Sequence, residues 1–314
     1  MTGHVIVRAV DGKRPATLSR KVLTGILRRN MDYRGIIVTD DMMMAAISDH
    51  YGTARAARMA ARAGADVIMV VGGYGDQVAT LDALLSGIRS GDLARKRVKK
   101  AAQRVVKAKC RAHLWGERYV KHRRAARVSG TKASRVSAAR IARHSITLVK
   151  NKRDLLPFRP KSTKRILVTG AMHTGRLAKT ARRIARARVG EYPVSVTPTS
   201  GQINEAVRRA RNSGRVIVST YSRSRLPDSQ ATLVRRLVET GKPVVAVSVG
   251  LPYDIKRYPG VRAYLASYAQ GPWPSVTSPP LRAVIKVIFG SQPGGKLPVK
   301  IGDRYPYGRG LRYR

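Results

Sequence analysis

The stretch that most constrains the fold is residues 35–71, which read GIIVTDDMMMAAISDHYGTARAARMAARAGADVIMVV. An apolar run at residues 36–38 ends in Thr-Asp-Asp, and an Ala-rich segment then leads to a second apolar run at residues 67–71. Short apolar runs on either side of a helical segment are typical of parallel strands that are buried on both faces. The stretch therefore predicts a strand, helix, strand unit with Asp40 and Asp41 where the first strand ends.

These two carboxylates are the first candidates for chemistry. In a barrel of parallel strands and helices, the C-terminal ends of the strands carry the catalytic residues, so Asp40 and Asp41 stand where a catalytic acid would stand. Aspartates at a strand end also cap helices or bind Mg²⁺. The pair alone leaves these three interpretations open.

The remaining sequence predicts further strands and helices. Before the central stretch we expect a buried strand at residues 5–7 and a helix at residues 18–30, capped by Ser19. After it we expect helices at residues 78–90, 93–115 and 134–144. Beyond these, apolar runs predict strands at residues 165–169, 194–197, 216–220, 244–249 and 261–267, and helical patterns lie at residues 176–186, 203–212, 230–240 and 280–289. Strands separated by helices at this spacing predict a parallel sheet that is covered on both faces.

The domain organisation follows from a break in these patterns. From residue 118 to residue 131, charged residues, Ser and Gly replace hydrophobic periodicity, which is typical of a boundary. We therefore expect a first α/β domain at residues 1–117, a linker with a leading helix at residues 118–160, and a second α/β domain at residues 161–314.

The charge of the chain is unusual, with 63 Lys and Arg against 17 Asp and Glu and a net charge of +46. Residues 1–92 hold 12 basic and 9 acidic side chains, so most of the excess lies further along. A field of this size attracts polyanions such as anionic glycans or nucleic acid. The basic residues also recur within amphipathic segments, where they form solvated helix faces, so both interpretations stay open.

Several classes of protein are disfavoured by what the sequence lacks. A single cysteine, Cys110, offers neither a disulfide framework nor a metal cluster, and we expect no cofactor or metal. Gly72, Gly73 and Gly75 follow a predicted strand, but no Lys-Ser or Lys-Thr pair follows them as in a phosphate-binding loop. No apolar run approaches the roughly 20 residues of a membrane span, and we find no secretion signal. This favours the cytoplasm by default, or the cell wall or secretion if a leader lies upstream.

Several blocks of sequence then point to a known family. In the first half these are MTGH (residues 1–4), RPATLS (14–19), GIIVTDDMMMAAI (35–47) and AGADVIMV (63–70). In the second half they are ITLVKN (146–151), LLPF (155–158), GKPVVAVSVGLPYDI (241–255) and FGSQPGGKLPV (289–299). The chain resembles the C-terminal part of a family 3 glycoside hydrolase, most like the two-domain bacterial β-N-acetylglucosaminidases that trim peptidoglycan. The resemblance implies an α/β fold, with a partial (β/α)8 TIM-type barrel followed by an α/β sandwich domain with a mostly parallel sheet.

The resemblance also implies roles for particular residues. Asp40 matches the carboxylate nucleophile, which directly follows a Ser or Thr at the strand end. Asp41, His4 and Met44 match positions near the pocket and are expected to bind or line the substrate. A retaining glycosidase pairs its nucleophile with a second group about 5 Å away that protonates the leaving oxygen. A carbohydrate substrate is therefore expected, with no metal.

Two departures from the family pattern shape the functional hypothesis. The Lys-His-x-Pro-Gly-His-Gly loop that carries the family's proton donor is absent, since none of the six histidines lies in a Pro-Gly-His context. The first 115 residues also supply about three strands, whereas a closed barrel takes eight. We therefore expect an incomplete hexosaminidase-like site, with the missing half-barrel supplied by another chain or by a segment upstream. A third possibility is that the first hundred residues fold differently and the sandwich domain is the stable part. The alternative is a non-catalytic basic module that binds anionic glycan or nucleic acid.

Overall fold

The structure is a computed structural model of residues 1–314, and it describes all of them except residues 117–118, 159–164, 186, 270–277 and 314. The described chain forms two compact units, Met1–Ala125 and Ala126–Arg314. Among the described residues, we find no helix that combines the length and the apolar character needed to cross a membrane.

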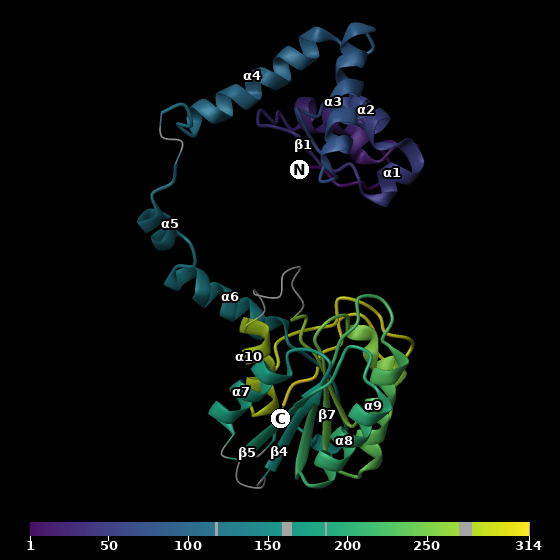
Figure 1. The fold of residues 1–314 in the computed structure, drawn as a ribbon, viewed down its shortest axis with the longest axis vertical. Helices are drawn as coiled ribbons and strands as arrows, with labels where there is room; N and C mark the ends of the chain where they lie inside the picture. Colours follow the sequence, from purple (N-terminus) through teal and green to yellow (C-terminus); the bar gives the residue numbers. More distant parts are fainter. Residues whose placement is uncertain (117–118, 159–164, 186, 270–277, 314) are drawn as a thin grey trace. The chain divides into compact units, whose positions relative to one another are not determined.

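The N-terminal unit is built around two parallel strands, β1 (Val38–Asp41) and β2 (Val67–Met69). Its helical elements are the 3₁₀-helix η1 (Ala16–Leu18), the π-helix η2 (Lys21–Asn30), and the α-helices α1 (Ala45–Tyr51), α2 (Thr53–Ala63), α3 (Tyr74–Arg89) and α4 (Arg95–Arg111). Helix α5 (His122–Val128) follows and contains the boundary between the two units along the chain. The predicted strand, helix, strand arrangement of residues 35–71 is thus present, with two helices between the strands (Figure 1).

Small residues allow α2 to pack closely in this unit. Ala56, Ala60 and Ala63 of α2 are buried in one core with Ile37 and Met42. Burying a face of this kind removes apolar area from water, which is the main force that holds a short helix against a sheet. This core fixes β1 and the turn that follows it.

The predicted strand at residues 5–7 is wrong. Val5, Ile6 and Val7 have no strand conformation, and their side chains are 65%, 50% and 39% exposed. Among the described residues, the segment before η1 pairs with β1 only through an isolated parallel bridge between Thr2 and Thr39. Because residues 5–7 have no hydrogen-bonded strand partner among the described residues, their β-forming side chains do not produce a strand.

The C-terminal unit contains a six-stranded sheet in the order β3-β8-β7-β6-β4-β5. Its strands are β3 (Thr147–Asn151), β4 (Arg165–Gly170), β5 (Arg188–Pro193), β6 (Arg215–Thr220), β7 (Val244–Ser248) and β8 (Ala263–Ala266). Only β3, which the strand pattern did not predict, runs antiparallel to its neighbour β8; the other described pairs are parallel. The prediction of a mostly parallel sheet is therefore confirmed.

Helices cover both faces of this sheet (Figure 1). One face packs against α6 (Lys132–Ser145), α7 (Thr174–Ile184) and α10 (Ser278–Ile288), and the other against α8 (Ser200–Arg211) and α9 (Asp228–Glu239). Successive strand residues alternate between the two cores, as Val245 and Val247 do with Ala246. This is the layered α/β arrangement that the alternating pattern predicts.

One strand of this unit lies elsewhere than predicted. We expect a strand at residues 194–197, but the structure places β5 at Arg188–Pro193, at the edge of the sheet. Val194 is buried directly after the strand. Most residues of β5 are exposed or half-buried, so this strand lacks the apolar run from which a buried strand is recognised.

Candidate active site

Asp40 lies near the end of β1 with its main chain fixed and part of its carboxylate open. Its N–H donates to the carbonyl of Thr2 (3.0 Å), and the N–H of Thr2 donates to the carbonyl of Val38 (2.9 Å). The Asp40 Oδ1 accepts the N–H of Asp41 (2.8 Å). Within the part of the chain that the structure describes, Oδ2 accepts no hydrogen bond, and the residue is half-buried. The carboxylate is therefore oriented through one of its two oxygens.

Asp41 joins the ends of the two strands. Its Oδ1 accepts the N–H of Met43 (3.1 Å) and the N–H of Val71 (3.0 Å), which follows β2. Hydrogen bonds from two backbone amides stabilise the ionised carboxylate in this position. The side chain of Asp41 therefore holds the turn after β1, which also fixes the direction of Asp40.

His4 is held by both ring nitrogens. Its Nε2 lies 2.9 Å from the carbonyl oxygen of Asp41, and its Nδ1 lies 3.0 Å from the Thr17 Oγ1. Because a carbonyl oxygen only accepts, Nε2 carries a proton and donates it to Asp41. With both nitrogens engaged, the ring supports the main chain beside Asp40 and leaves no nitrogen for proton transfer to a leaving oxygen.

Met44 differs from the methionine two residues before it. Met42 is fully buried in the core of the unit, whereas Met44 is 46% exposed at the start of α1. Its carbonyl accepts the N–H groups of Ile47 (2.8 Å) and Ser48 (3.0 Å) in the first turn. Met44 is therefore exposed beside the turn after β1, and its role in lining the substrate stays a prediction.

Two threonines that were not among the predicted site residues support the site. Thr17 is fully buried; its hydroxyl donates to the Gly3 carbonyl (3.1 Å) and also contacts His4 and Thr2. Thr39, equally buried, accepts the N–H of Met69 (2.9 Å) and so joins β1 to β2. The available signal was that polar residues stand within the RPATLS block and within an apolar strand.

The described residues include no cluster of three or more His, Cys, Asp or Glu side chains that could hold a metal ion. The arrangement around Asp40 is instead a set of hydrogen bonds that joins the end of β1 to the N-terminal segment and to β2. Such a set orients a carboxylate.

Two models of known protein families match this chain. Residues 1–108 match the glycosyl hydrolase family 3 N terminal domain, and residues 146–308 match the glycosyl hydrolase family 3 C-terminal domain. The chain belongs to glycosyl hydrolase family 3. The family resemblance and the fold class inferred from the sequence are thus confirmed.

The relatives align with between 35% and 91% of this chain and with a smaller share of their own length. The family 3 β-N-acetylglucosaminidase from a Paenibacillus strain superposes with a TM-score of 0.72 at 28% sequence identity, covering 90% of this chain and 54% of its own. Beta-hexosaminidase LpqI of Mycobacterium tuberculosis is 35% identical over 115 residues, which are 35% of this chain and 29% of that protein. The lysosomal beta glucosidase of Dictyostelium discoideum is 25% identical over 91% of this chain and 40% of its own length. The chain thus spans about half or less of these relatives.

Proposed function

We propose that this chain carries the nucleophile and the C-terminal domain of a retaining β-N-acetylhexosaminidase that acts on terminal N-acetylglucosamine of peptidoglycan-type glycans. The observation that supports this most is the position of Asp40 at the end of β1, anchored through Oδ1 and open at Oδ2, within a segment that matches the family's N-terminal domain. His4, Asp41 and Met44 are proposed to shape the substrate pocket around it.

The reaction proceeds in two displacement steps. The Asp40 carboxylate attacks the anomeric carbon, the bond to the leaving oxygen breaks, and a general acid protonates that oxygen. Water, deprotonated by the same group now acting as base, then attacks the anomeric carbon and releases the sugar and Asp40. The hydrogen bond from the Asp41 N–H to Oδ1 leaves Oδ2 as the attacking oxygen.

The general acid has no candidate among the described residues of the site. Both nitrogens of His4 are engaged, and Asp41 accepts two backbone amides. We propose that the acid and the remaining barrel strands are supplied from outside residues 1–314, upstream in the same polypeptide or on another chain. General acid–base catalysis contributes about 10²- to 10⁴-fold, so the chain alone is expected to be a weak enzyme or an inactive one.

The choice of substrate rests on relatives. The Paenibacillus protein is named a β-N-acetylglucosaminidase and the Mycobacterium protein a beta-hexosaminidase, whereas the Dictyostelium protein is named a beta glucosidase. The sequence identity over the aligned part is higher for the first two. This favours N-acetylglucosamine over glucose as the sugar bound next to Asp40.

The proposal is tested with nitrophenyl N-acetylglucosaminide and nitrophenyl glucoside, incubated with the purified chain alone and together with an N-terminal half-barrel from a family 3 relative. We expect nitrophenol release from the N-acetylglucosaminide in the mixture only. Asp40→Asn should abolish this release. Asp49→Asn, which changes an exposed carboxylate in α1, serves as the matched control and should leave it unchanged. Absence of turnover in every mixture would contradict the proposal.

A further inference from the structure

A basic cavity lies at the other end of the strand pair from Asp40. Asp40 lies near the C-terminal end of β1, whereas Asp66, which lies beneath the cavity, directly precedes β2. Because β1 and β2 run parallel, these residues mark opposite ends of the pair. The cavity therefore lies apart from the proposed catalytic site, and its capacity to bind a ligand does not depend on the glycosidase function.

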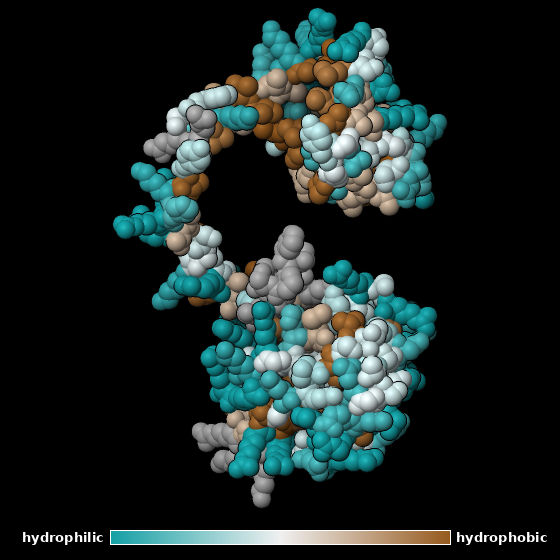
Figure 2. Space-filling model, in the orientation of Figure 1, coloured by the Kyte–Doolittle hydropathy of each residue, from teal (hydrophilic) through white to brown (hydrophobic). Residues whose placement is uncertain are grey.

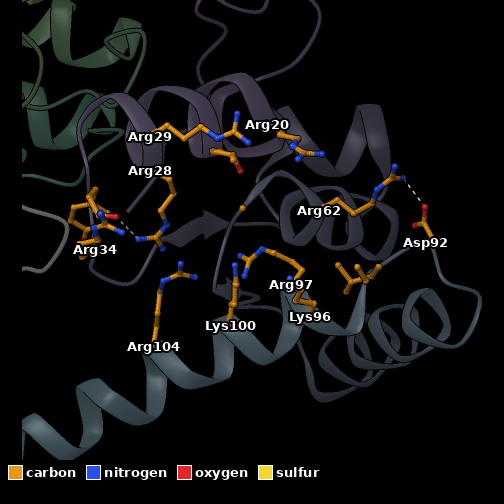
Figure 3. A pocket seen from close by; sticks show the side chains of 15 residues that line it. Arg20, Arg28, Arg29, Arg34, Arg62, Asp92, Lys96, Arg97, Lys100 and Arg104 are labelled. Carbon is orange, nitrogen blue, oxygen red and sulfur yellow. Dashed lines mark hydrogen bonds and ion pairs between the residues drawn. The ribbon is translucent and has the colours of Figure 1, made fainter.

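The cavity has a volume of about 630 Å³ and lies between η2 and α4 (Figure 3). A volume of this size accommodates a small-molecule ligand. Figure 3 shows side chains of both helices extending toward the same space. Nine cationic side chains line it: Arg20, Arg28, Arg29, Arg34, Arg62, Lys96, Arg97, Lys100 and Arg104.

A buried carboxylate organises the inner wall of this cavity. The Asp66 side chain is inaccessible to solvent and pairs with Arg28, with Arg97 (3.1 Å) and with Arg104 (3.0 Å). It also accepts the N–H of Ile37 (3.0 Å). One carboxylate thus holds three guanidinium groups in fixed positions, and their charges exceed its own by two.

The other cations of the cavity are only partly compensated. Asp92 pairs with Arg62 (2.6 Å), and the exposed Asp32 pairs with Arg34. Of the cations that line the cavity, four form no ion pair with any described residue: Arg20, Arg29, Lys96 and Lys100. Nine cations against three carboxylates leave six positive charges uncompensated around one concavity.

The free protein bears an electrostatic cost for this arrangement. Burial lowers the pKa of Arg28; Asp66 opposes that shift, and the charges of Arg104 and Arg97 add to it. An arginine nevertheless stays protonated, so the repulsion persists. Lys96 and Lys100 stand four residues apart on α4, a spacing at which like charges repel. A bound anion would remove this repulsion.

One buried donor is also left over. The Arg97 Nη2 pairs with Asp66, but its Nη1 is buried and has no hydrogen-bond partner in the part of the chain that the structure describes. A buried donor without an acceptor destabilises the free protein. Arginine donors are suited to the oxygens of phosphate, which they bind through paired hydrogen bonds.

We propose that the cavity between η2 and α4 binds a small anion with two or more linked phosphate groups. Inner guanidinium groups held by Asp66 would contact one phosphate, and the unpaired Arg29, Lys96 and Lys100 at the outer wall would contact the next. A concave site whose donors point to one space favours a compact multivalent anion. An extended polymer instead binds along an open groove.

The test is titration calorimetry of the full chain with inorganic tripolyphosphate at physiological salt. The pocket variant is Lys96→Gln with Lys100→Gln, and the control is Lys99→Gln with Lys107→Gln, which removes the same charge from exposed positions on the same helix outside the cavity. Arg29→Gln and Lys21→Gln form a second matched pair on η2. Circular dichroism verifies that all variants fold alike.

We expect one tight site per chain, weakened about tenfold in the Lys96/Lys100 variant, which corresponds to about 1.4 kcal/mol, and by less than twofold in its control. Equal weakening in both variants, many equivalent weak sites, or no binding would overturn the proposal.

A nucleoside triphosphate and a hexose bisphosphate distinguish sources of the phosphate groups, and preference for either supports the proposal. If heparin binds more tightly than tripolyphosphate and loses affinity equally in pocket and control variants, the basic surface acts as a whole and the proposal fails.

Discussion

The two units of this chain differ in how completely they bury their apolar surface. In the C-terminal unit, six strands are covered on both faces by helices, and strands such as β7 are buried at every residue. In the N-terminal unit, two strands carry a single smaller core, and large apolar side chains such as Val71 (67%) and Tyr74 (83%) are exposed. Figure 2 shows hydrophobic residues on the surface of the N-terminal unit, whereas the same view of the C-terminal unit is mainly hydrophilic.

This contrast separates the source of stability from the source of chemistry. The covered sheet supplies the larger buried area, which is the dominant favourable term in folding. The candidate nucleophile and the basic cavity both lie in the unit with the smaller core. Predictions that compare the two units therefore test whether polar contacts, rather than apolar burial, hold the functional geometry.

The largest effect is expected in amide hydrogen exchange of the full chain. Amides of β6 and β7 should exchange at least about 10³-fold more slowly than those of β2, because the central strands open only when the covered sheet unfolds. Mass spectrometry of peptides from each strand measures the ratio. Equal protection of the two units would show that the N-terminal unit is as stable as the sheet and would contradict the difference in stability proposed for them.

Removal of the buried carboxylate should destabilise the N-terminal unit strongly. Asp66→Asn leaves three half-buried guanidinium groups without their buried anion, and removing one partner of a buried ion pair typically costs about 3–5 kcal/mol. Faster exchange of α2 and β2 amides measures the loss. Asp92, the partner of Arg62, is more exposed than Asp66. Asp92→Asn should therefore lower the free energy of unfolding by at most about 1 kcal/mol. Similar effects of the two variants would refute the role given to Asp66.

A core substitution in each unit sharpens the contrast. Leu265→Ala in β8 removes a fully buried side chain of the large core and should lower the free energy of unfolding of the C-terminal unit by about 2–5 kcal/mol. Leu23 of η2 is also buried, but in the core of the N-terminal unit. Leu23→Ala should therefore leave the urea transition of the C-terminal unit unchanged and speed amide exchange only in the N-terminal unit. A shift of the same transition by both variants would contradict the independence of the two cores.

The smallest effect concerns pH. Asp254 is buried, and burial raises the pKa of its carboxyl, while hydrogen bonds from Thr220 (2.7 Å) and Ser222 (2.7 Å) oppose the shift. Since the folded pKa lies above the unfolded one, this group stabilises the fold most at pH values below about 3.8 and loses that contribution as the pH rises through the folded pKa. Urea unfolding from pH 4 to 7 should show this decline, and Asp254→Asn should flatten it. An unchanged slope in the variant would assign the pH dependence to other groups.

Much of the sheet was predictable because its central strands are continuous apolar runs. The segments that became β6 and β7 are buried on both faces and read that way in the sequence. The predictions for the edge strand β5 and for residues 5–7 were wrong. Pairing at the edge of a sheet depends on a partner strand and on exposure, which local sequence does not encode.

The site was predictable in part. The strand, helix, strand pattern predicts the place of Asp40 at the end of β1, and its role as nucleophile stays a prediction. The bond from His4 to the Asp41 carbonyl joins residues 37 positions apart, and no periodicity reports it. Likewise, the helical spacing of Arg97 and Arg104 is visible in the sequence, but their convergence with Arg28 on Asp66 joins positions 31 to 38 residues apart and is visible only in the tertiary structure.

Covalent trapping of a sugar tests most directly whether Asp40 is the nucleophile. A dinitrophenyl 5-fluoro-N-acetylglucosaminide has a leaving group that departs without protonation, and its fluorine slows hydrolysis of the intermediate, so the first step can be observed without the general acid. With the half-barrel supplied, mass spectrometry of the digested chain should find the sugar on the peptide that contains Asp40, and Asp40→Asn should prevent it. Labelling of another residue, or of Asp40→Asn to the same extent, would contradict the account.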